Sequence, residues 1–102
     1  MIKHIVMWTL KDEALGKTKS ENRAAMKAML ESLPAKIPGL AVELEAVTDG
    51  LFESVPATDI ALYTVFRSKE DLKAYAVHPE HQKVVEFIKS VAAERRVIDY
   101  EV

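Results

Sequence analysis

The sequence predicts a single α+β domain, built in the order strand, helix, strand, strand, helical pair, strand. One observation is that stretches with a period of two, typical of strands, alternate with stretches whose apolar residues recur at helical spacing. Another is the length, because 102 residues are enough for one domain and too few for two. We therefore expect residues 1–102 to form one domain.

Four segments show the alternation of β-strands. The first, residues 2–10, places His4 and Trp8 on one face and Ile5 and Met7 on the other. The remaining three are the segments at 39–47, 59–67 and 95–102. In the second strand, Leu40, Val42, Leu44 and Ala46 are expected to share the apolar face. Because the first strand is apolar on both faces, we expect both faces to be covered.

The first helix is expected from about Thr18 to Leu33. Thr18 and Glu21 have the spacing of a capping box, in which each residue satisfies a backbone amide at the helix start. Pro34 lacks an amide hydrogen and is expected to end the helix. The polar segment before Thr18 is expected to be a connection, and residues 48–58 a long exposed loop.

The second helical segment is expected to break into two helices. Ser68 and Asp71 repeat the capping pattern, and the first helix should run to the residue before Pro79. Proline is favoured in the first turn of a helix, so a second helix is expected to begin there. His78 would lie at the junction and cap the second helix.

This order of elements is that of the split βαβ, or ferredoxin-like, βαββαβ fold. Its four-stranded antiparallel sheet is covered by helices on one face only. Since several strands are apolar on both faces, the uncovered face needs a partner, and a twofold dimer covers it with one self-complementary surface. We therefore expect a homodimer.

The composition narrows the function classes. The 14 basic and 16 acidic residues nearly cancel, and no basic stripe is interleaved with aromatic residues, which argues against nucleic-acid binding. The chain has no cysteine, which excludes thiolate nucleophiles and favours a cytoplasmic location. The short apolar stretch near the start is interrupted by Lys3 and His4 and lacks a cleavage site, so no signal peptide or membrane segment is expected.

Three segments resemble one known family. IKHIVMWTLKD, LKAYAVHPEHQKVVEFI and ERRVIDYEV together resemble the stress-responsive A/B barrel domain (Dabb) family over essentially the whole chain. The most specific part is a tyrosine three residues before His-Pro-x-His, here Tyr75, His78, Pro79 and His81, together with His4 in the first strand. The resemblance implies a dimeric α+β barrel, in which two sheets enclose a core and each subunit keeps a cavity between sheet and helices.

The resemblance also implies a candidate activity. A plant branch of the family includes polyketide cyclases, which close a poly-β-keto chain by intramolecular aldol condensation without a metal or organic cofactor. The catalytic histidine of that branch matches His81, its tyrosine matches Tyr75, and a cavity-lining histidine matches His4. Two further pocket residues of that branch, a histidine and a tyrosine, are replaced here by Asp59 and Met26.

The chemistry of these side chains agrees with a pocket at the helix break. Imidazole titrates near neutrality and serves as a general base or acid, and a tyrosine hydroxyl can stabilise a developing enolate. Tyr75 in the last turn of one helix and His81 in the first turn of the next could converge on one cavity. The apolar walls are expected from Trp8, Phe66, Phe87 and Ile88. Each residue also has a structural alternative: the aromatic residues and His4 as core, and His81 as a hydrogen bond at a helix start.

Other polar features are weaker. The pair His78 and His81 has the spacing of two metal ligands, but no third or fourth ligand accompanies it, so no metal or cofactor is predicted. Some family members hold a structural cation with backbone carbonyls at the end of the first helix, here around Leu30, Leu33 and Lys36. Arg95 and Arg96 could meet an anionic ligand at the end of the sheet or pair with nearby carboxylates, namely Glu94, Asp99 and Glu101.

The sequence thus predicts a cytoplasmic Dabb-type dimer whose pocket accepts a small apolar or oxo, polyketide-like metabolite. Three hypotheses stay open. The protein could be a cofactor-independent cyclase or lyase, with His81 as base and Tyr75 as hydrogen-bond donor. It could bind the metabolite without turnover, or form a stress-protective oligomer that has no ligand.

Overall fold

The computed structural model describes all 102 residues and has the predicted order of main elements. The long strands are β1 (Ile2–Leu10), β4 (Ala41–Val47), β5 (Ile60–Phe66) and β6 (Ala92–Glu101). The helices are α1 (Lys19–Lys36), α2 (Lys69–Val77) and α3 (Pro79–Val91), and a short hairpin consists of β2 (Glu13–Ala14) and β3 (Lys17–Thr18). The predicted ferredoxin-like α+β fold is confirmed. None of the helices is both long and apolar enough to cross a membrane.

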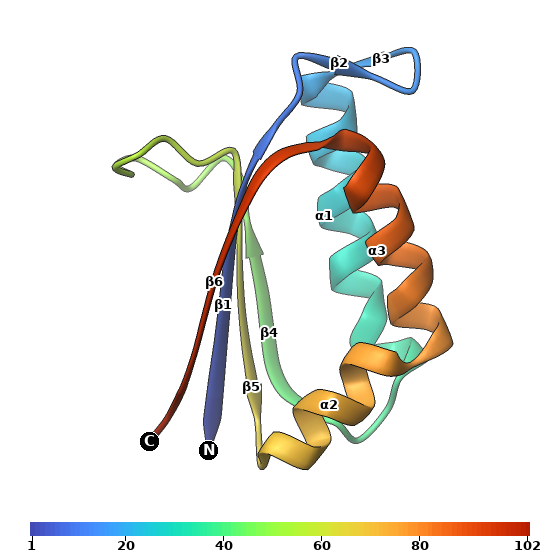
Figure 1. Cartoon of the computed structure of the whole chain (residues 1–102), viewed down its shortest axis with the longest axis vertical. Helices are drawn as coiled ribbons and strands as arrows, with labels where there is room; N and C mark the ends of the chain where they lie inside the picture. Colours follow the sequence, from blue (N-terminus) through green and yellow to red (C-terminus); the bar gives the residue numbers. More distant parts are fainter.

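The four long strands form one antiparallel sheet in the order β4-β5-β1-β6. All helices lie on one face of this sheet, and the other face is uncovered (Figure 1). The register aligns Trp8 of β1 with Arg95 of β6, and His4 with Asp99, so each pair shares the helix-facing side. The neighbouring pair Met7 and Arg96 lies on the uncovered face.

The core fills the space between the sheet and the helices. Its buried members come from all layers: Val6, Trp8, Met26, Leu30, Leu33, Ile60, Phe66, Val84 and Val91. On the uncovered face, Ile98 is 54% exposed and Tyr100 is 40% exposed, although both are large and apolar or aromatic. The sheet therefore has one face packed against the helices and one face whose apolar residues meet solvent.

Helix α1 begins as predicted but ends later. Thr18 and Glu21 form the capping box, with the Thr18 hydroxyl accepting from the Glu21 amide at 3.2 Å. The prediction that Pro34 ends the helix is wrong, because the helix continues through Pro34 to Lys36. Proline forfeits one intrahelical hydrogen bond but adopts helical backbone angles. Burial of Leu33 and Ile37 on either side of it offsets that loss.

Two details of the chain path differ from the prediction. The segment before α1 is a β-hairpin rather than a plain connection, and its turn residues Leu15 and Gly16 both have positive φ, as a type I′ turn requires. In β4, the register shifts between Ala41 and Glu43. This irregularity puts Ala41 opposite Phe66 on the helix-facing side and leaves Val42 exposed, so the prediction that Val42 shares the apolar face is wrong.

Candidate functional site

The site is organised around the break between α2 and α3. His78 has extended backbone angles (φ −61°, ψ 137°), and Pro79 follows as the first residue of α3. The Nδ1 atom of His78 accepts the Glu80 amide at 3.1 Å. The predicted role of His78 as the cap of the second helix is confirmed.

This cap releases a backbone carbonyl that then holds His81. In an uninterrupted helix the amide of Glu80 would donate to the carbonyl of Ala76. Here the Ala76 carbonyl instead accepts from Nδ1 of His81 at 3.0 Å and from Nε2 of Gln82 at 2.6 Å. Because a carbonyl oxygen only accepts, Nδ1 of His81 carries the hydrogen, and Nε2 of the neutral ring keeps its lone pair.

The surroundings of His81 favour this neutral form. Burial lowers the pKa of His81 most. The charge of Arg95, and that of His4 when it is protonated, lower this pKa further, against a raising effect of the hydrogen bond to Ala76. At neutral pH the ring is therefore unprotonated at Nε2. It can accept a proton from a bound molecule.

Tyr75 lies beside His81 at the end of α2. Its ring is tilted against His81 at a centroid distance of 5.3 Å and packs edge-on against Phe66 at 5.1 Å. The residue is only 5% exposed, and its hydroxyl has no hydrogen-bond partner in the protein. Burial raises the pKa of Tyr75 to about 12, so the hydroxyl stays protonated and remains a donor.

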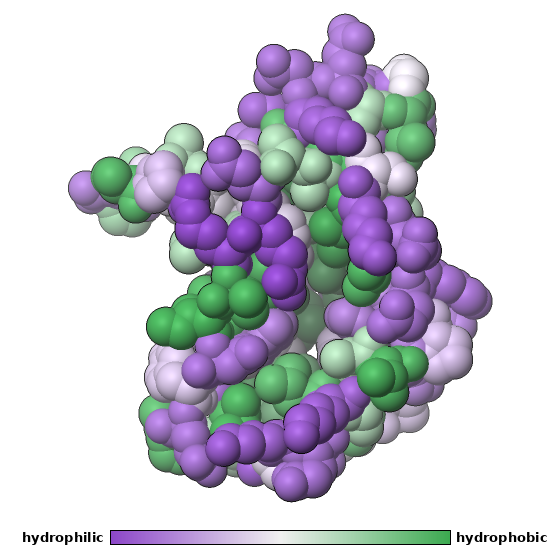
Figure 2. Space-filling model, in the orientation of Figure 1, coloured by the Kyte–Doolittle hydropathy of each residue, from purple (hydrophilic) through white to green (hydrophobic).

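These two residues line a cavity of about 350 Å³ between the sheet and the helices. Its lining is mainly apolar: His4, Val6, Trp8, Leu30, Leu62, Leu72, Tyr75, Ala76, His81, Val85, Ile88, Lys89 and Arg95. Figure 2 shows a hollow between the sheet and the helices, with hydrophobic residues at depth and hydrophilic residues at its rim. The volume and the apolar lining are those of a small-molecule site.

The structure brings together most of the residues expected at the site. His4, Trp8, Tyr75, His81 and Ile88 all line the cavity. The two phenylalanines do not: Phe66 is fully buried in the core against the ring of Tyr75, and Phe87 packs against the core outside the lining.

Asp99 is a site residue that the sequence did not reveal. Its carboxylate accepts a hydrogen bond from Nδ1 of His4, its neighbour across the strands. This bond fixes the ring orientation of His4 and leaves Nε2 for the cavity. Asp99 was one of three carboxylates expected to pair with Arg95 or Arg96. Its pairing with His4 follows only from the register of β1 against β6.

The indole of Trp8 adds a second unused donor. Trp8 is 4% exposed and lines the cavity, and its Nε1 has no hydrogen-bond partner in the protein. Buried polar groups are normally paired, and an unpaired one costs free energy. Two residues of the cavity lining therefore each carry a buried donor without a partner, and a third, His81, carries an unprotonated base.

Positions that differ from the plant cyclases have structural roles here. Asp59 accepts the amide of Leu10 at 2.8 Å and pairs with Lys19 at 3.3 Å, outside the cavity lining. Met26 is completely buried in the core.

No three histidine or acidic side chains lie close enough to hold a metal ion, and His78 is engaged as a helix cap. The carbonyl of Leu33, at the possible cation position, accepts the amide of Ile37 at 2.8 Å.

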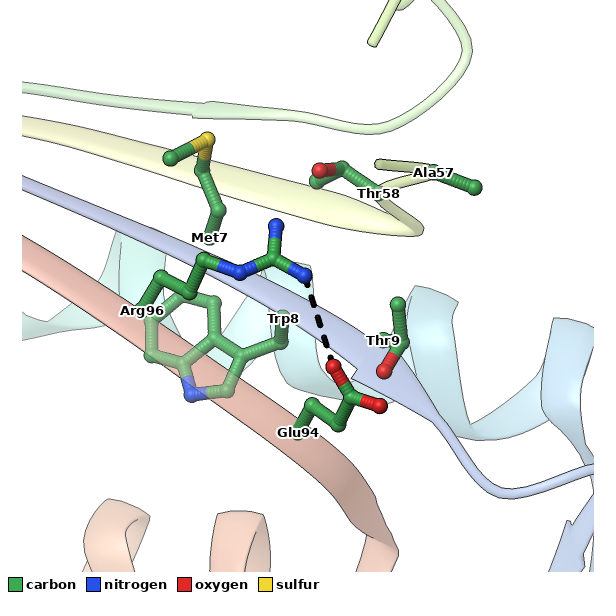
Figure 3. Close-up of a pocket in the computed structure, with 7 residues that line it drawn as sticks. All are labelled: Met7, Trp8, Thr9, Ala57, Thr58, Glu94 and Arg96. Atoms are coloured by element: carbon green, nitrogen blue, oxygen red, sulfur yellow. Dashed lines mark hydrogen bonds and ion pairs between the residues drawn. The ribbon is translucent and has the colours of Figure 1, made fainter. Parts of the chain in front are cut away.

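A shallow depression on the uncovered face has no comparable chemistry. Figure 3 shows Arg96 beside Met7, with its guanidinium directed to Glu94 at 3.4 Å. The depression is too shallow to hold a water molecule.

Comparison with known proteins shows which family the chain resembles. The family model described as the stress responsive A/B barrel domain, Dabb, matches residues 2–102. The chain belongs to the Dabb family. A 39-residue stretch is 44% identical to the stress-response A/B barrel domain-containing protein DABB1 of Arabidopsis thaliana. That stretch covers 38% of this Dabb chain and 19% of the Arabidopsis protein.

Solved structures share the fold along nearly the whole chain. A dimeric ferredoxin-like protein from Bacteroides fragilis is 32% identical, with a TM-score of 0.83 over 99% of this Dabb chain and 95% of that one. A hydroxynitrile lyase from Passiflora edulis has a TM-score of 0.79 at 18% identity, over 99% of this chain and 92% of that one. The second likeness is one of fold alone.

The pKa of His81 can be tested by ring NMR titration. We expect a midpoint below the ordinary value of 6.5 and the tautomer with hydrogen on Nδ1. Between the folded pKa and pH 6.5, the unfolded chain binds a proton at His81 that the folded chain does not. The stabilisation from the buried neutral ring is therefore fully present above pH 6.5 and is lost as the pH falls through the folded pKa. The variant Arg95→Gln should raise the midpoint. A midpoint at or above 6.5 would contradict the described surroundings.

Proposed function

We propose that the cavity binds a small apolar oxo compound and that the protein moves a proton on it without a cofactor. The observation that supports this most is the pairing, in one apolar cavity, of an unprotonated imidazole nitrogen on His81 with an unused hydroxyl donor on Tyr75. A base and an oxygen-stabilising donor are what enolisation of a ketone requires.

In the proposed step, the ligand carbonyl accepts a hydrogen bond from the hydroxyl of Tyr75. Nε2 of His81 takes a proton from the carbon beside the carbonyl, and the electron pair of the broken C–H bond moves to the carbonyl oxygen as an enolate. The low polarity of the cavity strengthens the hydrogen bond that holds this oxygen. The imidazolium then returns its proton to carbon. In the alternative, an aldol cyclisation, the enolate carbon attacks a second carbonyl and the imidazolium protonates the alkoxide that forms.

The size and lining of the cavity support an apolar ligand body, because Val6, Leu62 and Ile88 surround the polar groups. The Passiflora protein of the same fold is a hydroxynitrile lyase, so the fold is compatible with a lyase reaction. Binding without turnover is the second candidate function, because the unpaired donors of Tyr75 and Trp8 could hold a ligand oxygen without any reaction.

A cytoplasmic location is part of the proposal, because the chain has no cysteine and so lacks the disulfides typical of small secreted domains.

The proton-transfer proposal predicts hydrogen exchange in a simple ketone. In D₂O at pH 7, the protein should accelerate exchange of the methylene protons next to the carbonyl of 1-phenyl-2-butanone, followed by NMR. His81→Asn should remove the acceleration, because the amide keeps a donor for the Ala76 carbonyl but has no basic nitrogen. Tyr75→Phe should reduce it about 10²-fold, the effect of losing one oxyanion donor.

His78→Asn is the matched control. Asparagine is a good helix cap, so this variant keeps the helix break and should exchange like the wild type. If the wild type binds the ketone but does not accelerate exchange, the binding-only function holds. If His81→Asn exchanges as fast as the wild type, the role of His81 as base is wrong.

We further propose that the protein is a homodimer joined through the uncovered sheet face. That face exposes Ile98 and Tyr100 to solvent, which is costly for a monomer. The loop between β4 and β5 projects to the same side of the sheet (Figure 1), and its Phe52 and Val55 are 97% and 93% exposed. The dimeric description of the Bacteroides relative supports the same assembly.

Two adjacent residues of β6 test the dimer. Ile98→Lys places a charge on the uncovered face and should convert the dimer to a monomer at micromolar concentration, measured by native mass spectrometry. Val97→Lys is the matched control: Val97 is 45% exposed but faces the helix side, so it should leave the dimer intact. A monomeric wild type, or equal effects of the two substitutions, would contradict the proposed interface.

A further inference from the structure

We propose that the ligand of this cavity is an acid, and that Arg95 binds its carboxylate at the cavity mouth while the cavity donors hold an oxo group inside. The inference rests on the proposed function, since it names the chemical class of ligand for the same cavity. Its basis is the position and the missing partner of one arginine.

Arg95 lies on the helix-facing side of β6, directly across from Trp8, and belongs to the cavity lining. It forms no ion pair or side-chain hydrogen bond, whereas its neighbour Arg96, on the other face, pairs with Glu94. An exposed arginine without a partner is common on a surface. Here, however, it lies at the rim of an apolar cavity that holds two unpartnered donors.

The other charges at the mouth leave Arg95 free for an anion. The lining contains Lys89, His4 and His81 but no acidic residue. Two acidic side chains contact these groups and are engaged by them: Glu86 pairs with Lys89 at 3.8 Å, and Asp99 pairs with His4. A ligand carboxylate would therefore meet a guanidinium and no competing carboxylate in the lining. Arginine binds carboxylates through two parallel hydrogen bonds.

The interior gives an independent reason to expect ligand oxygens. The Tyr75 hydroxyl and the Trp8 indole nitrogen both belong to side chains more than nine-tenths buried, and neither has a partner. The indole nitrogen only donates and the hydroxyl can donate, so both can pair with an acceptor such as a carbonyl oxygen. An oxo acid with an apolar body satisfies the interior donors at one end and Arg95 at the other.

The test uses an isosteric pair of probes, 5-oxo-5-phenylpentanoate and its uncharged primary amide. Both carry the same ketone and apolar body and differ only in the charge of the head group. Binding to the 102-residue chain is followed by fluorescence of Trp8, its single tryptophan and a lining residue, and by calorimetry. Arg95→Gln is compared with Arg96→Gln, the adjacent arginine on the opposite face.

We expect the wild type to bind the carboxylate about tenfold more tightly than the amide, with the preference falling as salt is added. Arg95→Gln should lose this preference while still binding the amide, and Arg96→Gln should behave like the wild type. Equal affinities of the wild type for the two probes, or equal effects of the two substitutions, would overturn the role of Arg95 while the proposed function stands. Failure of both probes to bind would overturn the ligand site itself.

Discussion

The candidate site depends on the backbone carbonyl of Ala76. Pro79 interrupts the helix, His78 takes the amide of Glu80, and the carbonyl that would have accepted that amide is left to accept from His81. One local interruption of the helix therefore sets both the direction of the imidazole and the nitrogen that carries its hydrogen. Gln82 donates to the same oxygen and holds the arrangement from a second direction. The two histidines of the HPEH segment thus have complementary tasks: one closes the helix, and the other faces the cavity.

The sheet supplies the opposite wall of the same cavity by an equivalent device. His4 is held through its Nδ1 by Asp99, as His81 is held by a carbonyl, and each ring leaves Nε2 for the interior. Between these rings and the apolar walls lie donors that the fold does not use, on Tyr75 and Trp8. Buried polar groups are normally paired. Of the four unpaired ones in this chain, Asn22 Oδ1 and Thr64 Oγ1 lie outside the cavity lining, whereas the donors of Tyr75 and Trp8 belong to residues that line it. Their retention beside a 350 Å³ cavity is the physical reason to regard this space as a ligand site rather than a packing defect.

Much of this structure could be predicted from local sequence patterns, because caps, strand alternation and the proline break act over a few residues. Thr18 and His78 cap their helices as expected. Predictions failed where distant contacts decide: burial of Leu33 and Ile37 carries α1 past Pro34, and a register shift turns Val42 outward. The partner of Asp99 was left open among the arginines and proved to be His4, and Arg95 and Arg96 could not be told apart, because their roles depend on the pairing of the first and last strands.

The effect of Tyr75→Phe on stability and binding tests the central claim most directly. If the hydroxyl is kept for a ligand, its removal should leave the free energy of unfolding in urea unchanged or raise it by up to about 1 kcal/mol, while binding of a ketone weakens. Thr64→Val removes another buried, unpartnered hydroxyl that is outside the cavity lining, so it should leave binding unchanged. A Tyr75→Phe protein that is clearly less stable would show that the hydroxyl serves the fold. A Tyr75→Phe protein that binds the ketone as the wild type does would show that the hydroxyl does not hold the ligand. Either result would contradict the account.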